Sequence, residues 1–215
     1  MAPDDLLVLT GAPGSWKTAV LQALGRDVER VPEPAREILA QQRATGGDAT
    51  PDRDPSRFVE LLLARAIERY ERSSRNGVVT VFDRGIPDRV AYAEILDVDP
   101  SASISASLRY RYRPTVLIFP PWEEIYATDD ERRMSFGDIV PFHEAIVAAY
   151  EASGYTLVDV PPAPIDVRAS FVREHVDRRR RDAPSPGASP RVRPPNAAAG
   201  SRRRGSSLRT PSPDG

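Results

Sequence analysis

The sequence predicts an α/β domain in which a parallel β-sheet is covered by helices on both faces. Three short runs of β-prone apolar residues, at 6–9, 78–82 and 115–119, suit strands that are buried on both sides. Stretches with the helical spacing of apolar residues lie between them, and strands that alternate with helices imply a parallel sheet. Since ligands of such sheets bind at the carboxyl ends of the strands, the loops after the strands are where function is expected.

The first half of the chain is expected to supply three strands and three helices. In order, we expect a strand at 6–9, a helix at 17–25, a weak strand at 28–31, a helix at 34–43, a long helix ending at 76–77 and a strand at 78–82. Pro34 suits a first helical position. The long helix is predicted because one of its faces is apolar, with Phe58, Leu61, Leu62, Ala66 and Tyr70.

The second half continues the alternation. We expect helices at 87–97 and 101–111, a strand at 115–119, a helix at 142–152, a strand at 156–160 and a closing helix at 165–178. Proline pairs at 120–121 and 161–162 stop the last two strands, since proline cannot donate to a sheet ladder.

The chain of 215 residues is long enough for one medium domain, which we place at 1–178, followed by a tail at 179–215. The tail is rich in Pro, Ser, Arg, Gly and Ala and is expected to be disordered, because it has too few large apolar residues to form a core. From residue 178 onward, ten arginines against two aspartates give a net charge of +8. The preceding part has 20 basic and 29 acidic residues, a net charge of −9.

Two readings of the basic tail stay open. It is either a solvated segment without a dedicated partner, or an electrostatic arm for nucleic acid or anionic lipid through Arg178–Arg181 and Arg202–Arg204. The absence of cysteine excludes disulfides and cysteine–zinc sites. The start of the chain does not read as a secretory signal and no apolar run is long enough to cross a membrane, so a cytoplasmic location is expected.

A glycine loop follows the first strand and is the strongest functional signal. The expected nucleotide-binding residues are Gly11, Ala12, Pro13, Gly14, Ser15, Trp16, Lys17 and Thr18. This is close to the pattern G-x-x-x-x-G-K-[ST], in which loop amides and the lysine hold phosphates and the hydroxyl joins Mg²⁺. Lys17 is the only lysine of the chain, and arginine is too long and planar to replace it.

Trp16 stands where this pattern has its second glycine. A bulky residue forced into a glycine-type conformation costs about 1–3 kcal/mol, or roughly 5- to 150-fold in affinity. Alternatively, the dihedral angles are helical and the indole points off the loop, or the indole folds over the loop and plugs it.

Asp83 and Arg84 end the second buried strand. Asp83 is expected beside the glycine loop if the two strands are neighbours, where it could hold Mg²⁺ through water or accept a proton from an attacking hydroxyl. Arg84 would face a phosphate or the substrate. The alternatives are a strand-end turn for Asp83 and a surface ion pair for Arg84.

Two further groups of charged residues are candidates for the substrate and for a lid. Glu33 could bind substrate hydroxyls or act as a base, with Arg36 as an anion contact; the alternative is charge that complements a helix dipole. Arg132 and Arg133 could steady transition-state charge from a mobile lid. Their alternative is a solvated helix with i,i+4 pairing.

Four strings resemble one family, the NadR-type AAA domain. They are TGAPGSWKT at 10–18, VPEPAREI at 31–38, FDRGIPD at 82–88 and PPWEEIY at 120–126. The resemblance covers about 6–177. It implies a three-layer α/β/α P-loop NTPase fold with a five-stranded parallel sheet in the order 2-3-1-4-5. It also implies ATP or GTP with Mg²⁺ at Gly11–Thr18, with Asp83 as the carboxylate of an Asp-Arg motif and Arg132 and Arg133 in a lid.

The combined expectation is an ATP-binding P-loop ATPase, or a kinase that transfers the γ-phosphate to a small-molecule acceptor resembling a nucleoside. Its catalytic residues would be Lys17, Asp83, Arg84, Arg132 and Arg133. The alternative is a nucleotide-binding regulatory module with a degenerate loop and no turnover, whose tail engages nucleic acid or anionic lipid.

Overall fold

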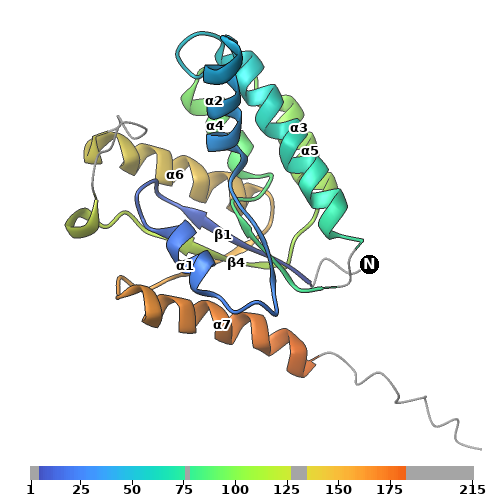
Figure 1. Ribbon diagram of the computed structural model, residues 1–215, viewed down its shortest axis with the longest axis vertical. Coiled ribbons are helices and arrows are strands. Elements are labelled where there is room, and N and C mark those ends of the chain that lie inside the picture. The colour runs from blue at the N-terminus through green and yellow to red at the C-terminus, as the bar shows by residue number, and fades with distance from the viewer. Residues whose placement is uncertain (1–4, 76–77, 127–134, 183–215) are drawn as a thin grey trace, which may run out of the picture. The chain divides into compact units, whose positions relative to one another are not determined.

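A computed structural model describes residues 5–75, 78–126 and 135–182 of the chain (Figure 1). Five parallel strands form one sheet in the order β2-β3-β1-β4-β5. The strands are β1 (Leu6–Gly11), β2 (Glu29–Val31), β3 (Thr80–Asp83), β4 (Thr115–Phe119) and β5 (Thr156–Asp159). The predicted fold class and strand order are confirmed.

Seven α-helices lie within these described residues. They are α1 (Lys17–Ala23), α2 (Pro34–Thr45), α3 (Pro55–Ser73), α4 (Asp88–Ile95), α5 (Ser101–Arg109), α6 (Phe136–Ala152) and α7 (Ile165–Asp182). A short 3₁₀ helix, η2 (Glu123–Ile125), follows β4 and was not predicted. None of the helices in the described part has the length and apolar character needed to cross a bilayer.

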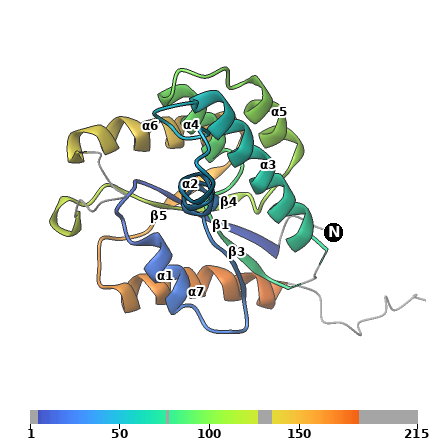
Figure 2. The same ribbon diagram turned by 45° about the horizontal axis from the view of Figure 1, so that its top comes forward.

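The side-chain alternation of β1 builds two separate cores, one on each face of the sheet. Leu7 and Leu9 pack with residues of α1 and α7, whereas Leu6 and Val8 pack with residues of α3, α4, α5 and α6. Figure 2 shows the resulting layers, with α1 and α7 below the sheet and the other group above it. Each buried side chain of this size contributes about 1.5–3 kcal/mol, so the three-layer arrangement follows from the strand pattern.

The strand register brings the functional loops together at one edge. Leu9 of β1 pairs with Asp83 of β3 and also with Leu117 of β4. The strands that precede the glycine loop and the Asp-Arg motif are therefore neighbours, which was the condition for Asp83 to lie beside the loop.

The largest differences from the predicted helix boundaries occur at α6 and α7. Helix α6 begins at Phe136 rather than at 142, and contains Pro141. An internal proline costs a helix about 3 kcal/mol, so the residues before it read as loop. The earlier start is stabilised by a capping box, in which Ser135 and Asp138 exchange side-chain and backbone hydrogen bonds. Helix α7 runs to Asp182, beyond the predicted end at residue 178.

Candidate nucleotide-binding site

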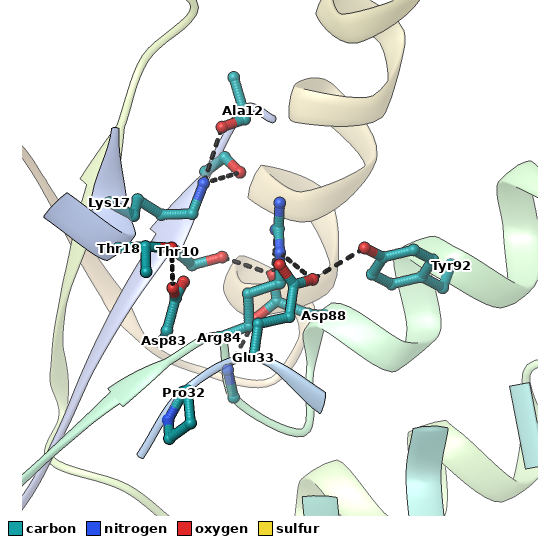
Figure 3. Close-up of polar contacts among 12 residues, drawn as sticks. Thr10, Ala12, Lys17, Thr18, Pro32, Glu33, Asp83, Arg84, Asp88 and Tyr92 are labelled. Carbon is teal, nitrogen blue, oxygen red and sulfur yellow. Dashed lines mark hydrogen bonds and ion pairs between the residues drawn. The ribbon is translucent and has the colours of Figure 1, made fainter. Parts of the chain in front are cut away.

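The glycine loop leaves β1 at Gly11 and enters α1 at Lys17 (Figure 3). Gly11 has φ 116°, and a Cβ there would lie 2.2 Å from the carbonyl oxygen of Phe119. The next amide, of Ala12, donates a hydrogen bond to that same oxygen at 3.0 Å. Only glycine permits this close approach between the loop and the end of β4.

The loop closes around the ammonium group of Lys17. Nζ donates hydrogen bonds to the carbonyl oxygens of Ala12 at 2.7 Å and Gly11 at 3.2 Å, and to Ser15 Oγ at 3.2 Å. Burial, and then the charge of Arg84, lowers the pKa of Lys17 to about 7. An anion placed next to this nitrogen favours its charged form, so a bound phosphate would raise the pKa of Lys17 and be attracted by the ammonium.

Thr18 and Asp83 form a second feature, on the other side of Lys17. Thr18 Oγ1 donates a hydrogen bond of 2.7 Å to Asp83 Oδ2. Among the described residues, the other carboxylate oxygen, Oδ1, is buried and has no hydrogen-bond partner. Burial, followed by the nearby charge of Glu33, raises the pKa of Asp83, which a bound cation would oppose.

This oxygen pair fits Mg²⁺. No group of three or more His, Cys, Asp or Glu residues that could hold a metal occurs in the described segments. Mg²⁺ does not need such a cage, because it commonly binds one or two protein oxygens together with phosphates and water. Thr18, through its hydroxyl, and Asp83, through Oδ1, are the residues that would hold Mg²⁺.

Trp16 has a left-handed backbone, with φ 62° and ψ 26°. The expectation that its dihedral angles could be those of a right-handed helix is therefore wrong. The residue takes a conformation that favours glycine, which costs a tryptophan about 1–3 kcal/mol. The residue is 46% exposed and lies on the wall of a cavity. Its indole Nε1 donates a hydrogen bond of 3.2 Å to the carbonyl oxygen of Ile125 in η2.

Arg84 also has a left-handed backbone, with φ 69°, but its side chain is only 2% exposed. Its Nε forms an ion pair with Glu33 Oε1 at 2.8 Å, and its Nη1 donates a hydrogen bond of 2.8 Å to Asp88 Oδ1. The surface ion pair considered for Arg84 is wrong, because both ion pairs are inside the protein. Figure 3 shows the guanidinium between the two carboxylates.

Glu33 is held ionised at the start of α2. It occupies the N-cap position but caps no backbone amide with its side chain. Instead, Oε1 accepts a hydrogen bond of 2.9 Å from the hydroxyl of Tyr92 in addition to the Arg84 ion pair. Burial raises the pKa of Glu33, but the charges of Arg84, Arg89 and Lys17, together with the Tyr92 hydrogen bond, outweigh it and leave the pKa below its ordinary value. The carboxylate thus lies on the cavity wall and caps no backbone amide of α2.

One cavity of about 1080 Å³ joins these features. Ligand sites commonly span about 300–1,000 Å³, so the cavity is large enough for a ligand of nucleotide size. Its wall runs from the glycine loop, α1, Asp83 and Arg84 to α2, the 46–53 loop and α4. Beyond the glycine loop, the wall includes Glu33, Ala35, Arg36, Leu39, Gln42, Arg43, Gly46, Gly47, Thr50, Pro51, Asp52, Arg53, Phe58, Tyr92, Ile95, Leu96 and Phe142.

Most of the sequence-predicted residues meet at this cavity. Its wall includes Pro13, Gly14, Trp16, Lys17, Thr18, Glu33, Arg36, Asp83 and Arg84. Gly11, Ala12 and Ser15 do not line it, but accept hydrogen bonds from the Lys17 ammonium. Arg132 and Arg133, the predicted lid residues, lie outside the described residues.

Sequence reasoning missed Asp88 and Tyr92, which bind Arg84 and Glu33. The available signal was their spacing of four residues at the start of α4, which places both side chains on one helix face. An aspartate in a first helical turn more often complements the helix dipole, so the spacing alone did not single it out.

The sheet order and the loop closed around Lys17 define a P-loop nucleotide-binding protein with a kinase-like fold. The chain belongs to the AAA domain family, whose model matches residues 6–168. The resemblance to the NadR-type AAA domain is thereby confirmed.

The solved structures that resemble the chain include the one titled "Crystal structure of NadR protein in complex with NR". The two share 17% sequence identity with a TM-score of 0.58, over 80% of this chain and 51% of that chain. The likeness is one of fold, and this chain spans about half the length of that protein. The search of curated proteins found no match.

Proposed function

We propose that the protein is an ATP- or GTP-dependent phosphotransferase that passes the γ-phosphoryl group to a small-molecule acceptor. The observation that carries this proposal is the single cavity, whose wall combines the phosphate-type loop with Glu33, Arg84 and residues of α2, the 46–53 loop and α4. A simple ATPase would need no cavity wall beyond the nucleotide site. The aromatic side chains of Phe58, Tyr92 and Phe142 suit an acceptor with a flat ring, such as a nucleoside.

The residues divide the reaction between them. Lys17 and the loop amides would hold the β- and γ-phosphates, while Thr18 and Asp83 would hold Mg²⁺, which neutralises phosphate charge when bound. Arg84 would neutralise the charge that develops on the transferred group, aided by Arg132 or Arg133. Arg36 would contact an anionic part of the acceptor.

Glu33 is the better candidate for the base, because Asp83 is engaged by Thr18. The acceptor O–H bond breaks as its proton passes to Glu33. A new P–O bond forms to the acceptor oxygen as the bond between the γ-phosphorus and the bridging oxygen breaks, and the nucleoside diphosphate leaves. The Tyr92 hydrogen bond and the Arg84 ion pair both fall on Oε1, which leaves the role of proton acceptor to Oε2.

Lys17→Ala tests the proposal, with Arg57→Ala as the matched control at a side chain that is 60% exposed on α3. Loss of one donor to transferred charge commonly costs about 10²- to 10³-fold in kcat. We expect that loss for Lys17→Ala, and an unchanged kcat for the control, when phosphate transfer from MgATP or MgGTP is measured across nucleosides and other hydroxyl acceptors. Full activity of the lysine variant would refute the assignment.

A second candidate function is a nucleotide-binding regulatory module without turnover, and the left-handed backbone of Trp16 favours it. The tail would then engage nucleic acid or anionic lipid; most of it lies outside the described residues. Thermal shift with nucleotide, with and without Mg²⁺, separates the two functions. Binding without phosphate transfer to any acceptor would support the module.

A further inference from the structure

Asp88, the first residue of α4, is a fully buried carboxylate that does not line the cavity. It accepts four hydrogen bonds. Oδ1 accepts from Thr10 Oγ1 at 2.6 Å and from Arg84 Nη1 at 2.8 Å. Oδ2 accepts from the Gly85 amide at 2.9 Å and from the Tyr150 hydroxyl at 2.6 Å. Four is the number of lone-pair sites that a carboxylate offers, so Asp88 is fully used inside the protein.

These bonds fix both ends of Arg84. The Gly85 amide follows Arg84 directly, so Asp88 restrains the backbone just after the left-handed residue as well as the tip of its side chain. On the other side, the Arg84 amide donates to the Leu9 carbonyl at 2.8 Å. Residues in sparsely populated conformations persist only where the surroundings over-determine them, and Asp88 supplies much of that restraint.

Gly85 is part of the same arrangement. A Cβ at this position would lie 2.7 Å from the Tyr150 hydroxyl, which itself donates to Asp88. The Gly85 amide also donates to that hydroxyl at 3.1 Å. The glycine therefore allows Tyr150 of α6 to reach Asp88 and the loop after β3 at once.

The restraint extends to both loops of the cavity. Arg84 connects Asp88 to Glu33 through the ion pair at 2.8 Å. Thr10, the residue just before Gly11, connects Asp88 to the glycine loop through its hydrogen bond. Asp88 therefore joins the start of the glycine loop to the guanidinium of Arg84, a residue of the cavity wall, although Asp88 does not line the cavity itself.

We propose that Asp88 is a positioning residue, which holds the Arg84 guanidinium in the orientation that phosphoryl transfer requires. This inference rests on the proposed phosphotransfer, since Arg84 needs a reaction to act on. A group displaced by about 1 Å can lower a rate about 100-fold without weakening ground-state binding. Asp88 thus acts on kcat through Arg84, and not on nucleotide affinity.

The test compares Asp88→Asn, which keeps the size of the side chain but loses the charge, with Tyr150→Phe, which removes one hydrogen bond and leaves the carboxylate. Asp88→Asn should lower kcat about 100-fold with an unchanged nucleotide Kd, whereas Tyr150→Phe, which removes a single bond to the carboxylate, should lower kcat no more than about two- to tenfold. Equal losses of kcat in the two variants would mean a general packing role and would overturn the proposal.

A double variant separates positioning from stability. If Asp88 acts through Arg84, then Asp88→Asn lowers kcat no further once Arg84→Ala is present. Multiplied losses would contradict the proposal. Should Asp88→Asn fail to fold, as judged by circular dichroism, Thr10→Val removes one bond to Oδ1 and should lower kcat about two- to tenfold; an unchanged kcat there would overturn it.

A measurement without turnover distinguishes failure of this inference from failure of the proposed function. The Nε–H signal of Arg84 in ¹⁵N NMR, assigned with Arg84→Lys, should be ordered in the wild type and mobile in Asp88→Asn. An equally ordered signal in both would overturn the positioning role, even if the wild type transferred no phosphate to any acceptor. Absence of transfer in a wild type with the expected NMR difference would instead refute only the phosphotransferase assignment.

Discussion

Trp16 and Arg84 both line the cavity and both have a left-handed backbone, but the protein holds them in different ways. The Arg84 guanidinium is buried between two carboxylates, and its central carbon lies 5.9 Å from the ring centroid of Tyr92 and 5.5 Å from that of Phe142. Trp16 is 46% exposed and holds η2 through one hydrogen bond of 3.2 Å. Similar backbone strain is thus strongly compensated at one residue and weakly at the other.

This difference indicates which part of the cavity is preorganised before a ligand binds. Compensation at Arg84 comes from charges that would be costly to separate inside the protein. At Trp16 a single bond to a partly exposed indole, worth about 0.5–1.5 kcal/mol, leaves the loop free to respond to its ligand. Substitutions at the two positions should therefore have unlike effects.

The largest effect is expected for Arg84→Gly. Glycine relieves the left-handed backbone, but Glu33 and Asp88 are left as buried charges without their partner, and such a change costs about 3–5 kcal/mol. Urea unfolding should show that loss of unfolding free energy. A variant as stable as the wild type would mean that the ion pairs do not compensate the strain.

Trp16→Gly is expected to act on ligand binding. Relief of a bulky side chain from a glycine conformation is worth about 1–3 kcal/mol, which corresponds to a gain of roughly 5- to 150-fold in nucleotide affinity. Calorimetric titration with MgATP measures it. Trp16→Ala is the control, since it removes the indole but retains a Cβ and should show no such gain; equal affinities for the wild type and Trp16→Gly would show that Trp16 is no impairment.

Acid should weaken the ion pairs of Arg84 with Glu33 and Asp88, but not the hydrogen bond of the Trp16 indole. The pKa values of Glu33 and Asp88 lie below their ordinary values of 4.5 and 3.8; burial opposes this in both, and the charges of Arg84 and Arg89 outweigh it. A carboxylate with a lowered folded-state pKa stabilises the fold above its unfolded pKa and loses that contribution as pH falls through the folded value.

The difference in unfolding free energy between the wild type and Arg84→Gly should therefore shrink below about pH 4. The effect of Trp16→Gly on unfolding should not change there, because an indole–carbonyl bond does not titrate. Unfolding curves at a series of pH values check both statements, and a pH-independent Arg84→Gly effect would contradict the ionised state of its partners.

The smallest effect is expected from truncation after Asp182. Substitutions away from packed features stay within about 0.5 kcal/mol, and removal of 183–215 should likewise leave the unfolding free energy and the MgATP affinity unchanged. Affinity for RNA or for anionic vesicles should be lost if the tail is an electrostatic arm. A large loss of stability would instead show that the two-part division of the chain is wrong.

The fold was predictable because its central strands are short, continuous apolar runs, as expected of strands that are buried on both faces. Leu6–Leu9 and Thr115–Phe119 could hardly be anything but central strands, and the glycine loop fixed the helix that follows the first of them. Helix α6 was less predictable, since the cost of Pro141 outweighs its neighbours locally while tertiary packing of Phe142 and Ile146 compensates it in the fold.

The site was predictable only in part. Lys17, Thr18 and Asp83 follow from chemistry at strand ends, whereas the roles of Glu33 and Arg84 depend on which charges face each other across a cavity. Asp88 shows the limit most clearly, because its four donors come from positions as far apart in sequence as Thr10 and Tyr150. No local pattern encodes such a convergence.

The place of the Trp16 indole gives the protein an intrinsic optical reporter. The chain has two tryptophans, and the other, Trp122, lies against the Arg168 guanidinium. In a Trp122→Phe background, emission would come from the indole on the cavity wall alone. A molecule bound next to the Trp16 indole changes the polarity around the excited ring. Occupancy of the cavity can therefore be measured as a shift of the emission maximum, before any chemistry has occurred.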